Sequence, residues 1–390
     1  MTQFIDLRTQ YARIQEDVER AVVGVLRSGQ YILGPEVEAL ESRLAEFVGT
    51  KHAISCASGT DALVIALMAK GIGPGDAVIT TPFTFMASAE AIAVVGATPV
   101  FVDIEANSFN IDPKGVEKAI AALKSGSASE HPLPRLDEAE LAKLSCRGII
   151  PVDLFGLPAD YEAINSIAEA NDLFVIEDAA QSFGASLNNR RAGALAEIAC
   201  TSFFPAKPLG CYGDGGALFT DDDELAQLFK SIRVHGQGAD KYDNVRLGIT
   251  GRLDAVQAAV LNVKMNIFED EVAERQRVAA TYIHHLEKSG LDLALPRVPE
   301  RSVSAWAQFS VVAISDGERA RLQARLADAR IPTMIYYPKP LHLQKAYDNL
   351  GYRAGDFPMS EDIGSRIFSL PMHPYLTEQQ IEGIVEAMKG

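Results

Sequence analysis

Cysteine and long apolar runs are both scarce in the 390-residue sequence. The four cysteines, Cys56, Cys146, Cys200 and Cys211, form no closely spaced pair, which argues against a zinc ribbon or a C-x-x-C redox motif. No apolar run approaches the length of a membrane span, and the opening segment "MTQFIDLRTQYARIQ" carries charges where a signal peptide needs an apolar core. These absences predict a protein of the cytoplasm without a membrane segment.

Positive charge is also in short supply. Lysine and arginine total 36 against 52 acidic residues, which gives a net charge of -16 and a sequence pI of about 4.9. No block of basic residues interrupts this acidic background, so the composition argues against nucleic-acid partners. An anionic small molecule would need a local cluster of basic residues.

Short apolar runs alternate with amphipathic helical patterns through the first two-thirds of the chain. Strands joined by helical crossovers are typical of an α/β fold with a mostly parallel central sheet that helices cover on both faces. The predicted strands are His52–Ala57, Ala77–Thr81, Thr98–Ile104, Gly148–Phe155, Leu173–Ala179, Ile198–Phe204 and Gly216–Thr220.

The pattern changes after Gly251, where a long helical segment, of one helix or two, leads into strand-like runs such as "AWAQFSVVAI" and "TMIYYP". We therefore predict a large α/β domain over residues 1–250 and a small α+β domain over residues 251–390 with the long helix as its link. Residues 124–147 are rich in proline and small polar residues, which favours an exposed, inert insertion with one short helix; a lid or an assembly contact is the alternative.

Two predicted strands end in residues suited to ligand binding, because ligands of open parallel sheets bind beyond the carboxyl ends of the strands. In "CASGTDAL", Gly59 permits a tight turn and Thr60 can cap a helix whose free amides hold phosphate; a plain strand–helix turn is the alternative. In "VIEDAAQSFGA", Glu177 and Asp178 point to opposite faces, so only one should reach a site, and Asp178 has an amide partner in Gln181.

The segment "SFFPAKPLGCYGDGG" places a single amine, Lys207, between two prolines in an apolar, turning stretch. A surface lysine needs no such setting, whereas burial moves the proton affinity of a reactive lysine into a useful range. An imine-forming lysine, an acid for a ring nitrogen, a stacking aromatic and a phosphate seat together match pyridoxal 5′-phosphate (PLP) chemistry. The residues that fill these roles are Lys207, Asp178, Phe85, Ser202, Gly59 and Thr60.

Six segments, taken in order, resemble the DegT/DnrJ/EryC1/StrS sugar-nucleotide aminotransferases of PLP fold type I. They are "SCASGTDAL", "TPFTFMASAEAI", "VIEDAAQSFGA", "TSFFPAKPLGCYGDGGA", "RVHGQG" and "GRLDAVQAAVL". The resemblance covers nearly the whole chain. Within the family, three segments most resemble enzymes that aminate C3 of a UDP-linked 2-acetamido-3-keto-hexuronic acid: "FIDLRTQYARIQ", "GQYILGPEVEALE" and "SLPMHPYL". Such enzymes use glutamate as donor and supply O-antigen and related lipopolysaccharide glycans.

The resemblance implies a role for each matching position. Lysine rather than histidine at position 207 favours transamination over dehydration. By resemblance, the Schiff-base lysine is Lys207, the partner of the ring nitrogen is Asp178, the partner of the ring hydroxyl is Gln181, the stacking residue is Phe85, and the phosphate residues are Gly59, Thr60 and Ser202.

Two positions depart from the family pattern. Thr250 stands where relatives usually have an asparagine that reaches the partner subunit's cofactor phosphate, while Arg252 is retained and could meet an anionic group. Tyr336 stands where the nearest relatives have histidine, just before Tyr337. If that position recognises the sugar carboxylate, the substrate need not be a uronic acid.

The segments around His235 and Thr250 resemble groups donated across a two-fold axis, which predicts a homodimer with its active sites at the interface. For His235 the alternative is a solvated loop, and for Tyr31 and Tyr337, which are candidates for sugar contact, it is simple packing. The seven histidines form no metal-ligand spacing, so we expect no metal site.

Other functions remain as alternatives. An NAD-type oxidoreductase would need G-x-G-x-x-G after a strand, which the sequence lacks. A non-catalytic sugar-nucleotide-binding regulator would have no need of Lys207 and Asp178. Within the family, the substrate could instead be another keto-sugar, aminated at C3 or C4 and linked to dTDP or GDP.

Overall fold

The computed structural model describes residues 2–141, 143–240 and 242–390 and is built around one seven-stranded sheet, in the order β1-β9-β8-β5-β4-β2-β3. The pairs from β8 to β3 are parallel, whereas β9 is antiparallel to both of its neighbours. The mostly parallel sheet predicted from the sequence is confirmed. Its strands are β1 (His52–Cys56), β2 (Asp76–Thr80), β3 (Thr98–Phe101), β4 (Ser145–Ile149), β5 (Phe174–Asp178), β8 (Ile198–Ser202) and β9 (Gly216–Thr220).

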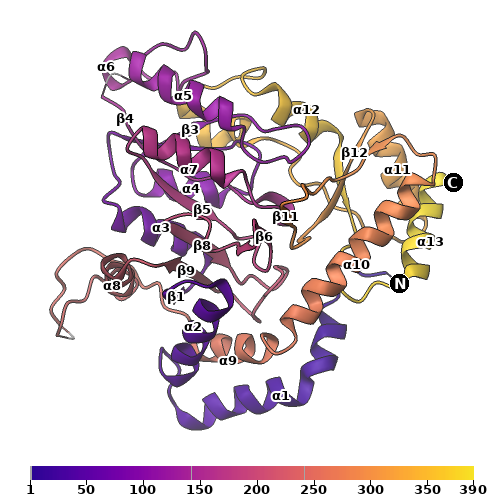
Figure 1. Ribbon diagram of the computed structural model, residues 1–390, viewed down its shortest axis with the longest axis horizontal. Coiled ribbons are helices and arrows are strands. Elements are labelled where there is room, and N and C mark those ends of the chain that lie inside the picture. The colour runs from indigo at the N-terminus through magenta and orange to yellow at the C-terminus, as the bar shows by residue number, and fades with distance from the viewer. Residues whose placement is uncertain (1, 142, 241) are drawn as a thin grey trace.

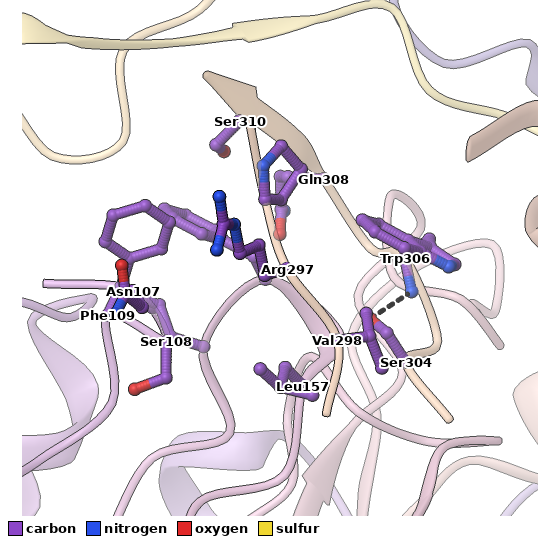
Figure 2. Close-up of a pocket in the computed structure, with 13 residues that line it drawn as sticks. Asn107, Ser108, Phe109, Leu157, Arg297, Val298, Ser304, Trp306, Gln308 and Ser310 are labelled. Atoms are coloured by element: carbon purple, nitrogen blue, oxygen red, sulfur yellow. Dashed lines mark hydrogen bonds between the residues drawn. The ribbon is translucent and has the colours of Figure 1, made fainter. Parts of the chain in front are cut away.

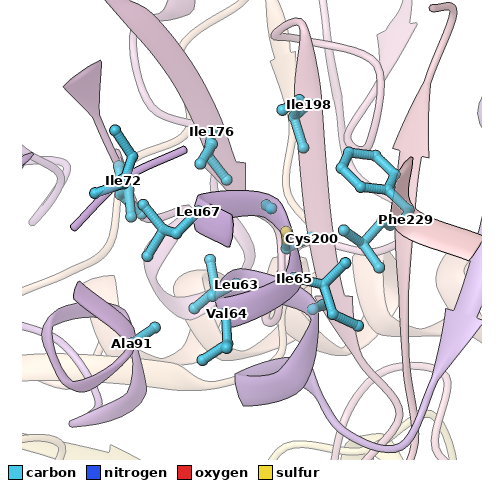
Figure 3. Packing of buried hydrophobic residues seen from close by; sticks show 14 of the residues in the cluster. Leu63, Val64, Ile65, Leu67, Ile72, Ala91, Ile176, Ile198, Cys200 and Phe229 are labelled. Carbon is cyan, nitrogen blue, oxygen red and sulfur yellow. The ribbon is translucent and has the colours of Figure 1, made fainter. Parts of the chain in front are cut away.

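One face of the sheet is covered by α3 (Gly59–Ala69), α4 (Ala87–Val94) and α8 (Asp223–Ile232). Helix α3 is buried on almost every side, because it packs against the sheet as well as α4 and α8. Its apolar side chains meet Ile176, Ile198 and Phe229 in one cluster (Figure 3). A helix in this position must be apolar all round, which explains why it shows no amphipathic stripe.

A second apolar cluster joins the sheet to α5 (Pro113–Ser125) and α7 (Tyr161–Ala170). A third joins it to α2 (Pro35–Val48) and includes Phe183, Phe203 and Phe219. The first helix, α1 (Leu7–Ser28), lies along α9 (Ala255–Lys264) at the edge of the molecule (Figure 1). Short elements complete this part: β6 (Ser186–Leu187), β7 (Arg190–Arg191) and the 3-10 turn η1 (Leu154–Gly156).

The C-terminal elements form a separate antiparallel sheet in the order β10-β12-β13. Helices α10 (Phe268–Glu287), α11 (Asp316–Asp328) and α13 (Glu378–Lys389) contribute to the apolar cluster on this sheet, which includes the stacked rings of Tyr282 and Phe309. The remaining elements are β10 (Leu293–Ala294), β11 (Ser302–Val303), β12 (Phe309–Ala313), β13 (Ile367–Leu370), α12 (Pro358–Arg366), η2 (Leu341–Leu343) and η3 (Lys345–Leu350).

The long helical segment predicted after Gly251 is two helices, α9 and α10, interrupted at Met265–Ile267. Helix α10 leads from the large sheet to the C-terminal elements (Figure 1). The N-terminus also reaches those elements, since the Phe4 carbonyl accepts a hydrogen bond from the Met372 amide at 3.1 Å. The division into domains at residues 250 and 251 stays a prediction.

The segment 124–147 is only partly the exposed loop that its composition predicts. Its short helix is present as α6 (Glu138–Leu141). His131, however, is buried, and its Nε2 lies 2.8 Å from the Phe101 carbonyl oxygen, while the Arg135 amide donates to the Leu350 carbonyl at 2.8 Å. These contacts dock the loop between β3 and the turns near residue 350, which composition alone does not reveal.

The expectation of a strand at "TMIYYP" is wrong. Within this stretch the structure has only an isolated bridge, between Met334 and Ser369. Tyr336 and Tyr337 instead turn toward the large sheet and line a cavity there. A short continuous run of apolar and aromatic residues does not by itself indicate a strand, because an irregular segment whose side chains line a cavity has the same composition.

Candidate active site

A cavity of about 620 Å³ lies at the carboxyl edge of the large sheet. Its lining includes the last residues of β5 and β8, Asp178 and Ser202, together with residues that follow β1, β2 and β4. This is where open α/β sheets bind ligands, and the volume suits a small-molecule site. The C-terminal part of the chain contributes Gln308, Ile335, Tyr336 and Tyr337 to the opposite wall.

Lys207 lies on the loop that connects β8 to its antiparallel neighbour β9, where Ser202 pairs with Gly216. Its amide donates to the Phe204 carbonyl at 2.8 Å and closes a turn, and its side chain lines the cavity. Burial lowers the pKa of the Lys207 amine to about 8, although the charge of Asp178 acts in the opposite direction. More of the nucleophilic neutral amine is therefore present at neutral pH than in an exposed lysine.

Asp178 faces Lys207 from the end of β5 and is buried. Its carboxylate accepts hydrogen bonds from the Ser88 hydroxyl at 2.7 Å and the Ala180 amide at 3.2 Å. Burial raises the pKa of Asp178, whereas Ser88, Lys207 and the Ala180 amide all oppose that rise. An acid in this setting can hold a cationic ring nitrogen.

Glu177 points to the other face of β5, as strand alternation predicts. Its two carboxylate oxygens accept hydrogen bonds from the amides of Gly193 at 2.6 Å and Leu195 at 2.9 Å. The sequence-based choice between the two acids therefore agrees with the geometry: Asp178 lines the cavity, and Glu177 orders a loop outside it.

The start of α3 forms a cradle beside Ser202. The Ser58 side chain caps the helix by accepting from the Asp61 amide at 3.0 Å, while the first amides of a helix have no partner within it. A Cβ at Gly59 would lie 2.7 Å from the Cβ of Ser202, so only glycine permits this approach. Gly59, Thr60 and Ser202 all line the cavity, and their amides and hydroxyls suit an anion such as phosphate.

Aromatic and amide groups form the wall next to Asp178. Phe85 is 57% exposed, and its ring centroid lies 6.5 Å from that of Tyr337. The Gln181 side chain accepts from the Phe155 amide at 2.7 Å and donates to the Tyr337 hydroxyl at 3.2 Å. An aromatic face left open toward a cavity can stack on a flat ring.

The remaining predicted residues lie outside the cavity. Tyr31 is 50% exposed, and its hydroxyl donates to the Leu26 carbonyl at 3.3 Å. The exposed Thr250 hydroxyl lies 2.8 Å from Nε2 of His235, which places these two residues together. Arg252 is half-buried, and its Nε has no hydrogen-bond partner within the described residues.

The cavity residues missed from the sequence include four polar ones, Thr84, Ser88, Asp214 and Gln308. Ser88 follows Phe85 by only three residues, and this closeness to a predicted cavity residue was an available signal. Gln308 had no such signal in the sequence, because it reaches the cavity from the C-terminal part of the chain, far from the other cavity residues along the sequence. It also borders a second cavity of about 20 Å³ (Figure 2), which has room for about one water molecule and is too small for a substrate.

Charge in the cavity is unbalanced. Of the described residues that line it, Lys207 is the one base, while Asp178 and Asp214 are acids. The described residues contain no cluster of three or more histidine, cysteine or acidic side chains that could hold a metal ion. No described helix is both long enough and apolar enough to cross a membrane.

Comparison with known proteins gives one consistent family. The model of the DegT/DnrJ/EryC1/StrS aminotransferase family matches residues 12–389. The chain is 47% identical over 388 residues to the UDP-2-acetamido-2-deoxy-3-oxo-D-glucuronate aminotransferase of Pseudomonas aeruginosa, and the match covers 100% of this chain and 99% of that relative.

Solved structures agree with this result. A DegT DnrJ EryC1 StrS aminotransferase from Brucella abortus superposes with a TM-score of 0.93 at 48% identity, over 100% of this chain and 99% of that one. NtdA from Bacillus subtilis with bound cofactor PMP superposes with a TM-score of 0.84 at 30% identity, over 99% of this chain and 83% of that one.

Proposed function

The chain belongs to the DegT/DnrJ/EryC1/StrS aminotransferase family, and we propose that it moves the amino group of glutamate to a keto-sugar nucleotide at the cavity that contains Lys207. It is a PLP-dependent sugar aminotransferase of the α/β class. The observation that carries the proposal is that a lysine of depressed pKa faces a buried aspartate across a cavity with a phosphate cradle.

The cavity residues fit PLP. The cradle at Gly59 leaves no space for a side chain yet presents amides and hydroxyls, which suits the cofactor phosphate. When bound, PLP supplies an electron sink that makes the Cα–H of an amino acid acidic. We assign the covalent link to Lys207, the ring nitrogen to Asp178, the phosphate to Gly59, Thr60 and Ser202, the ring hydroxyl to Gln181, and stacking to Phe85.

The chain's own groups then account for proton movement. With PLP bound at this site, the Lys207 amine would accept and move the proton of the substrate carbon, and its lowered pKa suits that role near neutral pH. The Ser88 hydrogen bond favours the ionised form of Asp178, which would hold the ring nitrogen protonated. The same lysine would move the proton between the substrate carbon and the cofactor, and water would then release 2-oxoglutarate and leave the amino group for transfer to the sugar.

We propose a UDP-linked 2-acetamido-2-deoxy-3-oxo-hexuronic acid as acceptor, aminated at C3, in the synthesis of lipopolysaccharide such as O-antigen. Support comes from the activity named for the Pseudomonas aeruginosa relative, which matches over the full chain. Tyr336 and Tyr337 line the cavity wall opposite the sheet, where they could contact the sugar. All four cysteines are free thiols, in keeping with the cytoplasmic setting that we propose.

A two-step assay tests this function. Glutamate alone should bleach the visible band of the PLP-loaded protein and release 2-oxoglutarate, which separates an enzyme from a binding protein. Addition of the UDP-3-keto sugar should restore the band, and a dTDP-4-keto sugar should not. Faster return of the band with the dTDP sugar than with the UDP sugar would reassign the substrate, and no response to glutamate would refute amino transfer.

We also propose a homodimer whose second subunit completes each site. One lysine cannot balance a phosphate, a nucleotide diphosphate and two acidic residues, so further cations are needed. His235, Thr250 and Arg252 lie outside the cavity of their own chain and are our candidates for the second subunit's contribution. Tyr31 is a further candidate for contact with the sugar. Its side chain is exposed, and its carbonyl accepts a hydrogen bond from the Ala255 amide, which places it near Arg252.

Subunit mixing tests the shared site. Lys207→Ala and Arg252→Ala proteins should each be inactive alone, and a mixture of the two should regain activity because one of its sites contains both residues. Light scattering should give a dimer. A mixture that stays inactive, or an active monomer, would contradict the shared site.

A further inference from the structure

Helix α9 holds the Lys207 loop through two side chains that the predicted chemistry does not use. Gln257 and Lys264 are seven residues apart, so they lie on one face of the helix. The Gln257 oxygen accepts from the Tyr212 amide at 2.9 Å. The Lys264 amine donates to the Gly210 carbonyl at 2.6 Å. The loop is thus fixed at two points just beyond Lys207.

Lys264 is an unusual residue in this position because it is buried, with 2% exposure. Its amine lies 4.3 Å from the centroid of the Tyr212 ring, and burial lowers its pKa to about 8 while Glu271 opposes that shift. No carboxylate in the described part of the chain lies within 4.0 Å of this amine. A buried cation without an ion pair is costly, so its bond to Gly210 has to offset that cost.

Gly210 connects Lys264 to the turn around Lys207, because it accepts the Lys264 hydrogen bond and packs against that turn. A Cβ at Gly210 would lie 2.5 Å from the Pro205 carbonyl oxygen and 2.7 Å from that of Phe204. The Lys207 amide donates to this same Phe204 carbonyl at 2.8 Å. The two sides of the turn therefore lie so close together that even a Cβ at Gly210 has no room, and a shift of Gly210 would press on the Phe204 carbonyl that holds the Lys207 amide.

We propose that Lys264 is a positioning residue for amino transfer, which fixes the Lys207 amine against the cofactor by holding the Gly210 carbonyl. Lys264 does not line the cavity, so it acts through the loop and not on the substrate. Gln257 serves the same purpose at Tyr212. This inference rests on the proposed function, since it concerns the reach of an amine that must meet PLP.

Lys264→Met tests the proposal, because methionine keeps the length and apolar packing but cannot donate a hydrogen bond. We expect the visible band of the Lys207–PLP link to shift or weaken and kcat to fall about 10- to 100-fold, because small misplacements of a reacting group have effects of that size. The KM for glutamate should stay within about threefold, since the cavity wall is intact.

Lys70→Met is the matched control. Lys70 also donates a hydrogen bond, to Glu197 at 3.0 Å, and lies 5.7 Å from the Phe174 ring, but among the described residues it has no hydrogen bond or ion pair with the loop. Its loss should lower thermal stability and leave the visible band and kcat unchanged. An unchanged band and kcat in Lys264→Met would overturn the inference.

Gln257→Leu and Gln257→Glu provide a second test that stands if Lys264→Met fails to fold. Leucine removes the acceptor for the Tyr212 amide, and glutamate keeps an oxygen there. We expect a lower kcat with leucine and recovery with glutamate; equal kcat values in the two variants would overturn the inference. A wild-type protein that forms no link with PLP would instead refute the proposed function.

Discussion

The Ser88 hydroxyl donates a 2.7 Å hydrogen bond to Oδ2 of Asp178, and Ser88 itself lies 3.1 Å from the Thr84 hydroxyl. All three residues line the cavity. Burial alone would push the pKa of Asp178 upward and favour its neutral form, whereas this bond favours the anion. A serine at the start of α4 thus preserves the charge on which an electron-withdrawing ring depends.

Ser88→Ala should lower kcat about tenfold, because a hydrogen bond to a charged group contributes about 1.5–3 kcal/mol and its loss raises the pKa of Asp178 further. Release of 2-oxoglutarate at saturating glutamate measures the effect. Ser369→Ala is the control, since Ser369 pairs with Ser310 at 2.8 Å in the C-terminal sheet. Equal rates in the two variants would contradict the role given to Ser88.

Lys207→Ala should abolish both the covalent link to PLP and turnover. The fold should survive, because the substitution removes an amine whose lowered pKa reflects unfavourable burial. Absorbance after borohydride treatment, steady-state rates and thermal melting of the apoprotein together check this. Turnover near the wild-type rate would show that another residue carries the chemistry.

Asp178→Asn and Glu177→Gln should separate function from stability on one strand. Asp178→Asn should leave the melting temperature nearly unchanged and remove most activity, because an amide cannot hold the ring nitrogen protonated. Glu177→Gln should retain activity and lower stability by about 1–3 kcal/mol, because its new NH2 group would face one of the two amides, of Gly193 or Leu195, that donate to the carboxylate. The reverse pattern would exchange the roles of the two acids.

The capture of PLP by the apoprotein should accelerate as pH rises through about 8. The pKa of Lys207 is lowered, so its neutral, nucleophilic amine becomes the major form above about pH 8. An exposed lysine would show the same rise near pH 10.4. Stopped-flow absorbance over a pH series gives the midpoint, and a midpoint near 10 would mean that Lys207 is not desolvated.

The sequence predicted the cavity residues best where the local sequence setting of a residue suits a single chemical role. Lys207 between two prolines, Asp178 at a strand end and Gly59 at a strand–helix turn all lie at the cavity. Local pattern sufficed because strand ends of a parallel sheet share one edge, so residues distant along the chain meet there without further information.

Contacts between distant segments were harder to predict. Gln308 reaches the cavity from the C-terminal part of the chain, and His131 docks on Phe101 from a loop whose composition indicates exposure. Both positions depend on how separate elements pack, and no local period encodes that. The extreme case is the group of Thr250, His235 and Arg252, because the contacts that we propose for them lie in another copy of the chain.

Since Ser202 and Gly216 are paired, the chain leaves the sheet and returns to it at a single point. The reactive amine therefore lies on a loop that joins two neighbouring strands, and not on a crossover to a distant strand. Amino-acid substitutions or small changes of length in this loop need not alter the order of the strands. The order of the strands therefore does not depend on the loop that contains the nucleophile.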